Sequence, residues 1–379
     1  MTSPQSGVHW RGFTNRRDLP KHELVQMGKN ICEAATGPGD GVKDIFLEIA
    51  DDCEQISKWN TAQEPRRAFG KGTSLYHQDP VSNCFWGDPV ADVYAVIARE
   101  NSCILALADG VSWGEKSRLT ARCAVAGCLQ HLNTHLFTAN TTLDIMEVLY
   151  DAFKNAHEFI IKKDGLLTTL CAAVVCPLKD FGKWGLCVLN VGDSLAFTYK
   201  KEKGVQEVTF GSHCDIKSRD MRCPGGSLGP YDGNNPDLSN LTFSFTILDT
   251  GDIVFLTSDG VSDNFDPVIR KKSLIDISAQ AVCANLLLHV LACTHKKRQH
   301  REKIQARGSH NLYRREERIH QGSEKGTSQL NCELPGKLDH AAVVAFEVGL
   351  YSTDGGNRRS LFEFFAGLKN GMRRASSSY

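Results

Sequence analysis

Residues 103–110 read CILALADG, an apolar run that ends in Asp109-Gly110. A second apolar run, VYAVI at residues 93–97, lies just before it, and a polar turn at residues 99–101 separates the two. Two short apolar runs on either side of a polar turn predict a buried β-hairpin. This hairpin ends at an acidic residue followed by glycine.

Helices are expected next, and strands after them. Residues 115–137 are rich in Ala, Leu and Cys and contain no proline, and the following segment repeats apolar residues at intervals of three or four. That stripe predicts a helix with one face in the core; it consists of Ile145, Val148, Leu149, Ala152, Phe153, Ala156 and Phe159. No polar ligands share this face, so we interpret it as core and not as a cofactor site.

The later apolar runs complete the order of elements. Strands are expected at residues 170–176, 186–199, 241–248, 253–257 and 341–348, with a third helix at residues 278–292. Strands in hairpins with the helices grouped between them favour an α+β fold with antiparallel sheets over a parallel βαβ repeat.

Bulk properties exclude several classes of protein. The chain has 379 residues, 41% of them hydrophobic, and a formal net charge of zero, so no nucleic-acid partner is expected. The 14 cysteines include no C-x-x-C pair, and we expect most of them to be small buried residues. The start of the chain has no signal-peptide pattern and no apolar run reaches a membrane span, so we expect a cytoplasmic or nuclear monomer.

Three aspartates stand at comparable places beside apolar strands. Asp109 and Asp259 each follow a strand and precede a glycine, and Asp339 comes just before the last strand. Carboxylates at the ends of strands in one sheet can converge, and such oxygen ligands suit Mg²⁺ or Mn²⁺. The alternative is that each Asp-Gly pair only marks a turn.

Five segments, in order along the chain, resemble motifs of the metal-dependent serine/threonine protein phosphatases of type 2C. They are LALADGVSWG at 105–114, LTTL at 167–170, LNVGDSLA at 189–196, GDIVFLTSDGVSDN at 251–264 and LDHAAVV at 338–344. The resemblance implies two antiparallel sheets packed as a central sandwich, flanked by α-helices. It also implies hydrolysis of phosphoserine or phosphothreonine in phosphoproteins by a metal-activated water.

The resemblance also implies a set of site residues. Asp109 would bridge two Mg²⁺ or Mn²⁺ ions, with the Gly110 carbonyl on one of them, and Asp259 and Asp339 would hold the other. Asp109 and Asp259 are the candidate catalytic residues. Asp164 would take a third, weaker ion.

The start of the motif series departs from the family pattern. The usual interval back from Asp109 places Asp88 as the first metal ligand, with Asn83 where the family has a phosphate-binding arginine. A second placement uses His77-Gln78-Asp79. Neither supplies the arginine, and Arg66 or Arg67 would have to fold back to replace it.

Three more substitutions lie close to the expected site. Val111 stands where many members have a histidine, Leu167 replaces a glycine and His340 replaces an asparagine. We interpret His340 as a packed or hydrogen-bonding residue, the alternative being a catalyst.

Three regions are expected along the chain. Residues 1–65 read as a partly ordered N-terminal extension, 66–348 as the phosphatase-like domain and 349–379 as a basic tail. A basic segment at about 295–332 interrupts the domain, as a flexible insertion or as a docking or nuclear-import surface. In the tail, residues 360–372 have the apolar spacing of an amphipathic helix, which would contact a membrane, a partner or the domain itself.

Two functions from different classes remain open at this stage. The first is an active metal-dependent phosphatase. The second is a catalytically impaired pseudophosphatase that acts as a binding or scaffold protein on the same fold. A nucleotide-binding enzyme is not supported, because the sequence has no G-x-x-x-x-G-K-[ST] loop.

Overall fold

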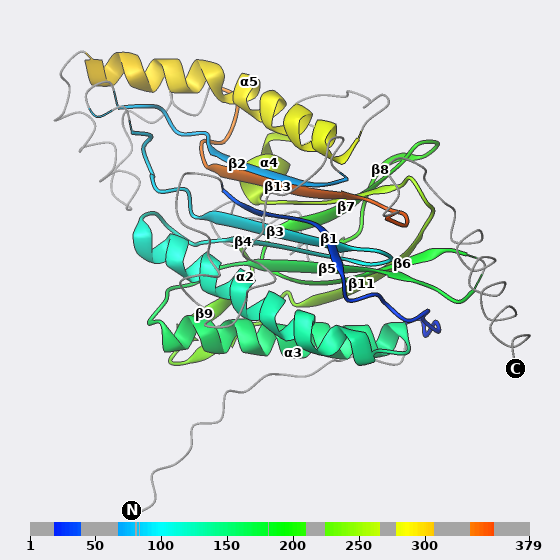
Figure 1. Ribbon diagram of the computed structural model, residues 1–379. Helices are drawn as coiled ribbons and strands as arrows, with labels where there is room; N and C mark the ends of the chain where they lie inside the picture. The colour runs from blue at the N-terminus through cyan, green and yellow to red at the C-terminus, as the bar shows by residue number, and fades with distance from the viewer. Residues whose placement is uncertain are drawn as a thin grey trace, which may run out of the picture.

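The computed structural model describes residues 19–38, 67–79, 82, 84–180, 182–209, 224–265, 278–306 and 334–351. Two antiparallel sheets pack face to face, and helices cover the outer side of each sheet (Figure 1). The predicted α+β sandwich flanked by helices is therefore confirmed.

The first sheet has six strands and the second has five. The first runs in the order β1 (Ile31–Gly37), β3 (Asp92–Arg99), β4 (Cys103–Asp109), β5 (Leu170–Pro177), β6 (Trp184–Val191) and β11 (Thr242–Leu248). The second runs in the order β2 (Ala68–Ser74), β13 (His340–Glu347), β12 (Ile253–Thr257), β7 (Leu195–Lys200) and β8 (Gly204–Glu207). Beside them lies a two-stranded ribbon of β9 (Ser227–Asp232) and β10 (Asn235–Asp237).

The long helices form the two outer layers. Helices α2 (Glu115–His135) and α3 (Thr142–Lys162) lie against the first sheet, and α5 (Ala279–Ala306) lies over the second (Figure 1). A capping box between Thr141 and Asp144 fixes the start of α3. The predicted stripe of α3 faces the core: five of its members are buried, and Val148 and Phe159 pack against the core with part of their surface exposed.

Side-chain alternation explains why the central strands read as continuous apolar runs. Along β4, Leu105 and Leu107 face the second sheet, whereas Ile104 and Ala106 face α2 and α3. Successive residues of a strand point to opposite faces, and here both faces are covered. The expected burial of most cysteines is also confirmed for the described part of the chain: of the ten free cysteines there, only Cys84 is exposed.

The stretch 186–199 forms two strands in different sheets, where the sequence suggests one continuous run. Strand β6 ends at Val191 in the first sheet and β7 begins at Leu195 in the second. The chain turns at Gly192, whose φ of 97° suits glycine, and a Cβ there would lie 2.5 Å from the Thr169 side chain. This crossing brings Asp193 to the end of the sandwich.

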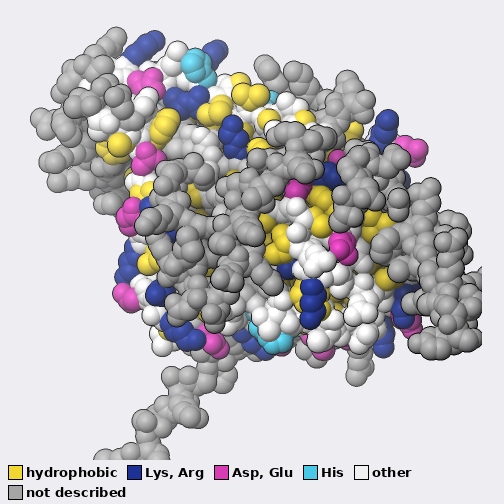
Figure 2. Space-filling model, viewed as in Figure 1, with side chains coloured by type: hydrophobic (Ala, Val, Ile, Leu, Met, Phe, Trp, Pro, Cys, Tyr) yellow, Lys and Arg dark blue, Asp and Glu magenta, His cyan; other side chains and the backbone are white. Residues whose placement is uncertain are grey.

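Two further elements lie in regions that the sequence marks as an extension or an insertion. Within the expected N-terminal extension, β1 pairs with β3 as an edge strand, because its small apolar residues fit against the neighbouring sheet. Helix α5 continues to Ala306 and so includes the first part of the basic segment, and Figure 2 shows Lys and Arg side chains over this end of the molecule. The remainder of that segment and the candidate helix at 360–372 lie outside the described residues.

The helices can be judged against the thickness of a bilayer. In the described part of the chain, none combines the length and the apolar composition that a membrane span requires.

Core packing between the sheets predicts a large stability effect at Leu105, which is completely buried. Leu105→Ala should lower the free energy of unfolding by about 2–5 kcal/mol, because it removes buried methyl groups and leaves a cavity. Val205→Ala on β8, where the side chain is 45% exposed, should change it by less than about 0.5 kcal/mol. Urea unfolding followed by circular dichroism measures both, and equal effects would contradict this packing.

Candidate functional site

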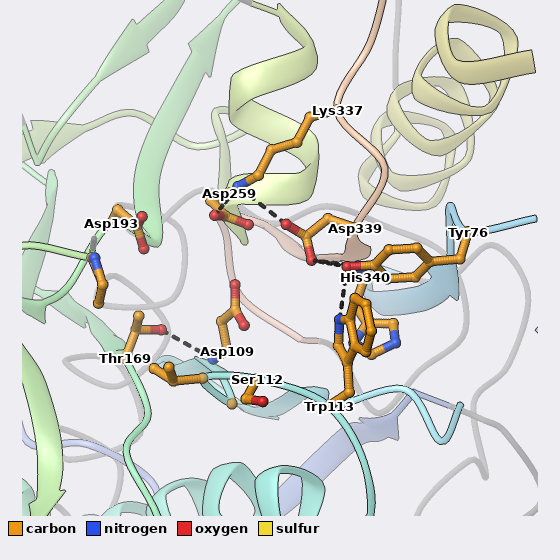
Figure 3. A pocket seen from close by; sticks show the side chains of 13 residues that line it. Tyr76, Asp109, Ser112, Trp113, Thr169, Asp193, Asp259, Lys337, Asp339 and His340 are labelled. Atoms are coloured by element: carbon orange, nitrogen blue, oxygen red, sulfur yellow. Dashed lines mark hydrogen bonds and ion pairs between the residues drawn. The ribbon is translucent and has the colours of Figure 1, made fainter. Parts of the chain in front are cut away.

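A cavity of about 360 Å³ opens at one end of the sandwich, where strands of both sheets start or finish. Figure 3 shows its side chains pointing toward a common centre from several elements. Its lining consists of Tyr76, Asp109, Gly110, Val111, Ser112, Trp113, Thr169, Asp193, Pro224, Asp259, Lys337, Asp339 and His340. The structure thus brings together four residues predicted from the sequence: Asp109, Gly110, Asp259 and Asp339.

The alternation of side chains along β4 points the Asp109 carboxylate into the cavity. Asp109 follows Leu105 and Leu107 on the face of β4 that looks toward the second sheet. The Thr169 hydroxyl accepts a hydrogen bond from the Asp109 backbone N–H at 3.0 Å, which fixes the end of the strand. Asp109 therefore points between the sheets at the edge of the sandwich, where no further core residue follows.

Asp92 is a site residue that the sequence analysis missed. It pairs directly with Asp109 across the β3–β4 hairpin and lies on the same face as Tyr94 and Val96. Asp92 is completely buried, and the side chains of Ser258 and Asp109 surround its carboxylate. The predicted hairpin could have identified Asp92, because counting pairs outward from the turn at residues 99–101 places Asp92 opposite Asp109.

Asp259 and Asp339 come from the second sheet. Asp259 begins α4 (Asp259–Ser262) directly after β12, and Asp339 precedes β13, the neighbouring strand. A Cβ on Gly260 would lie 1.8 Å from the His340 carbonyl oxygen, so only glycine allows the two backbones to meet here. The glycine of this Asp-Gly pair therefore serves close packing of the backbone, and its φ is outside the left-handed region.

Lys337 is the second residue that the sequence analysis missed. Its ammonium forms ion pairs with Asp259, with Asp263 at 3.1 Å and with Asp339 at 3.1 Å. Figure 3 shows the lysine reaching over Asp259 and Asp339 into the cavity. Its only signal in the sequence is its position two residues before a predicted metal ligand.

Crowded negative charge dominates the electrostatics of the cavity. Burial, followed by the charges of Asp92 and Asp259, raises the pKa of Asp109 well above its usual value. Burial is also the main reason for the raised pKa of Asp92 and of Asp259, and it raises the pKa of Asp193 to about 7. Ionising this set of carboxylates therefore requires more positive charge than Lys337 alone provides.

An aromatic wall closes the other side of the cavity. The Tyr76 hydroxyl donates to Asp339 Oδ1 at 3.3 Å and accepts a hydrogen bond from the Trp113 indole N–H at 2.9 Å. The Trp113 side chain is 50% exposed at the rim. His340 is buried and its Nδ1 accepts a hydrogen bond from the Ala91 N–H at 3.2 Å, in line with the hydrogen-bonding interpretation; burial lowers its pKa to about 4, so the ring is neutral at pH 7.

The two other predicted metal ligands lie apart from the cavity lining. Asp88 is exposed and accepts a hydrogen bond from the Phe85 N–H at 2.7 Å, while Asp92 stands at the strand end instead. The Asp164 side chain is 96% exposed and pairs with Lys116 at 3.0 Å, because it lies in the turn after α3. The alternative residue Asp79 accepts a hydrogen bond from Gln305 of α5 at 2.7 Å and does not line the cavity.

The expected phosphate-binding arginine is not supplied by Arg67. Its guanidinium donates to the carbonyls of Glu347 and Leu350, at the end of β13 remote from Asp339. The length of β13 puts about 20 Å between that end and the cavity. Arg66 and Asn83 lie outside the described residues, and no arginine occurs among the described residues that line the cavity.

The donor set of this cavity fits a hard divalent cation in part. Asp92 and Asp259 are buried carboxylates next to Asp109, and carboxylate oxygens are the ligands that Mg²⁺ and Mn²⁺ prefer. As the side chains lie, no three His, Cys, Asp or Glu residues in the described ranges are arranged to hold an ion. Lys337 forms ion pairs on the Asp259–Asp339 side and does not pair with Asp92 or Asp109.

Comparison with known proteins gives a family match. Residues 86–287, just over half of the chain, match the family model described as protein phosphatase 2C. The PP2C-like domain-containing protein CG9801 of Drosophila melanogaster is 47% identical over 211 residues, which cover 54% of this chain and 30% of that protein. The chain thus matches less than a third of the length of this curated relative.

Solved structures give weaker likenesses. The serine/threonine phosphatase PstP/Ppp of Mycobacterium tuberculosis is 13% identical, with a TM-score of 0.38 over 74% of this chain and 98% of that chain. Stp1 of Staphylococcus aureus is 10% identical, with a TM-score of 0.42 over 74% of this chain and 94% of that chain. At these scores the likeness adds nothing to what the chain's own fold and family match provide.

Because Asp92 is buried, its substitution should increase the stability of the metal-free protein and weaken cation binding. In EDTA, Asp92→Asn should raise the free energy of unfolding by roughly 1–3 kcal/mol at pH 8, because it removes a completely buried carboxylate that other carboxylates repel. The folded-state pKa lies above that of the unfolded chain, so this penalty grows as the pH rises and the gain should be smaller at pH 5.

The same variant should lose the stabilisation that Mn²⁺ gives to the parent, which is about 2.7 kcal/mol at 100 times the dissociation constant. Asp88→Asn is the matched control on an exposed carboxylate and should change neither quantity. Thermal and urea unfolding with and without Mn²⁺ measure both effects. A full Mn²⁺ response in Asp92→Asn would contradict this placement.

Proposed function

Because the chain belongs to the protein phosphatase 2C family, we propose that it hydrolyses phosphoserine and phosphothreonine in proteins, with Mg²⁺ or Mn²⁺ as cofactor. The observation that supports this proposal is the convergence of Asp109, Asp259 and Asp339 on one open cavity, with the buried carboxylate of Asp92 paired with Asp109 beside it. Two of these carboxylates come from each sheet, so folding of the whole sandwich assembles the site.

The chemistry follows from this arrangement. A bound divalent cation supplies a water of lowered pKa and neutralises charge on the phosphoryl oxygens. Asp92 and Asp109 would hold it on the first sheet, and Asp259 would reach it from the second. Phosphoryl transfer depends mainly on positioning and electrostatics, and these side chains are fixed by the strands that carry them.

The entrance to the cavity suits a phosphorylated side chain. Trp113 and Tyr76 form one wall, and the hydrogen bond between them orients the half-exposed indole. An aromatic face of this kind would pack against the aliphatic part of phosphothreonine or against a neighbouring residue of the peptide. We therefore propose phosphoproteins as substrates, with a monomer acting in the cytoplasm or nucleus.

A second candidate function is phosphoprotein binding without turnover. Two observations favour it: Lys337 lies in the cavity among the carboxylates, and no arginine is found among the described lining residues. A scaffold of this kind would keep the fold and the cavity but release no phosphate.

Phosphate release separates the two candidates. The purified chain with Mn²⁺ should hydrolyse a phosphothreonine peptide, and Asp109→Asn or Asp259→Asn should reduce kcat by at least about a hundredfold, because each removes a ligand charge at the reacting phosphate. Asp164→Asn, on a carboxylate that is 96% exposed and pairs with Lys116 away from the cavity, should retain parental activity.

Malachite-green assays of released phosphate measure these rates. No turnover by a folded parent chain that still binds the phosphopeptide would support the scaffold. Equal activity in the parent and in Asp109→Asn would show that the cavity is not the reacting site.

A further inference from the structure

We infer that the Lys337 ammonium takes the place of one divalent cation between Asp259 and Asp339, so that this cavity binds a single divalent cation, beside Asp92 and Asp109. The inference rests on the proposed cation site, and it concerns how many ions that site holds. It holds whether or not the chain turns over a phosphopeptide.

The contacts of the ammonium resemble those of a coordinated ion. A lysine ammonium has three N–H donors, and Lys337 directs its charge at three carboxylates: Asp259, Asp263 and Asp339. Oδ2 is the contacting atom on all three. A cation that approached Asp259 and Asp339 from the same side would meet these oxygens already engaged.

The burial of this group makes it part of the site. The Lys337 side chain is 18% exposed, and the side chains of Asp259 and Asp263 are 11% and 4% exposed. Ion pairs among groups so far removed from water are screened little by salt. Removing one partner of such a set leaves the others uncompensated, so the lysine is costly to displace.

Buried Asn264 fixes the backbone that presents the lysine. Asn264 Oδ1 accepts a hydrogen bond from the Lys337 N–H at 2.8 Å, and its amide donates to the carbonyls of Gly260 at 2.7 Å and Lys337 at 3.1 Å. Asn264 thereby ties the segment before β13 to the turn that carries Asp259 and Asp263. Lys297 of α5 adds a hydrogen bond to the Gly336 carbonyl at 2.8 Å.

The carboxylates that Lys337 does not contact can bind one divalent cation and not two. Lys337 contacts Oδ2 of Asp259 and forms its ion pairs with Asp259, Asp263 and Asp339, and none of these pairs involves Asp92 or Asp109. Asp92 is completely buried, and Asp109 lies beside it across the hairpin. A cation bound by these two carboxylates would not compete with the ammonium for the same oxygens.

The number of Mn²⁺ ions per chain tests this inference directly. Equilibrium dialysis with electron paramagnetic resonance of free Mn²⁺ should give one bound ion per folded parent chain at saturation. Lys337→Gln removes the ammonium and should raise that number to two. Lys200→Gln is the matched control: Lys200 is also 18% exposed and pairs with Asp252 at 3.6 Å, at the other end of β7, and its variant should still bind one ion.

Other outcomes overturn the inference. A parent chain that binds two ions, or none, contradicts the single-cation site even if Lys337→Gln fails to fold. A folded Lys337→Gln variant that still binds one ion contradicts the replacement by lysine. Phosphate release is measured separately on the same samples: its absence throughout would refute the proposed hydrolysis and leave the ion counts to decide this inference.

Discussion

Carboxylates at one end of the sandwich repel one another, and the fold must compensate for this repulsion. Asp92 and Asp109 end one hairpin, and Asp259 and Asp339 flank neighbouring strands of the other sheet. Packing the sheets face to face forces these groups together and removes them from water, which raises the pKa of Asp92, Asp109 and Asp259. Positive charge must offset this cost, and Lys337 supplies one part of it.

The sandwich tolerates this charge because its stability comes from other regions. Leu105 and Val96 fill the space between the sheets, and the stripe of α3 covers the outer face of the first sheet. A core of this kind keeps the acidic end in place even where its groups repel one another. Residues kept for function often lower the stability of a protein, and packing in other regions compensates for this loss.

Much of the fold could be predicted because its signals are local. The β3–β4 hairpin and the α3 stripe follow from apolar spacing alone, and three of the aspartates were found because each stands beside a clear strand. Asp92 was missed although the hairpin register points to it, since a single acidic residue at the start of an apolar run looks like a strand boundary. Lys337 and the structural role of Arg67 depend on contacts between distant segments, which sequence spacing does not encode.

A crystal structure of the Mn²⁺-soaked protein, with anomalous diffraction at the manganese edge, would locate the bound ions. We expect one anomalous peak in contact with the carboxylates of Asp92 and Asp109, with the Lys337 nitrogen still between Asp259 and Asp339. Carboxyl groups that point away from a shared centre, with no peak in the cavity, would contradict this expectation.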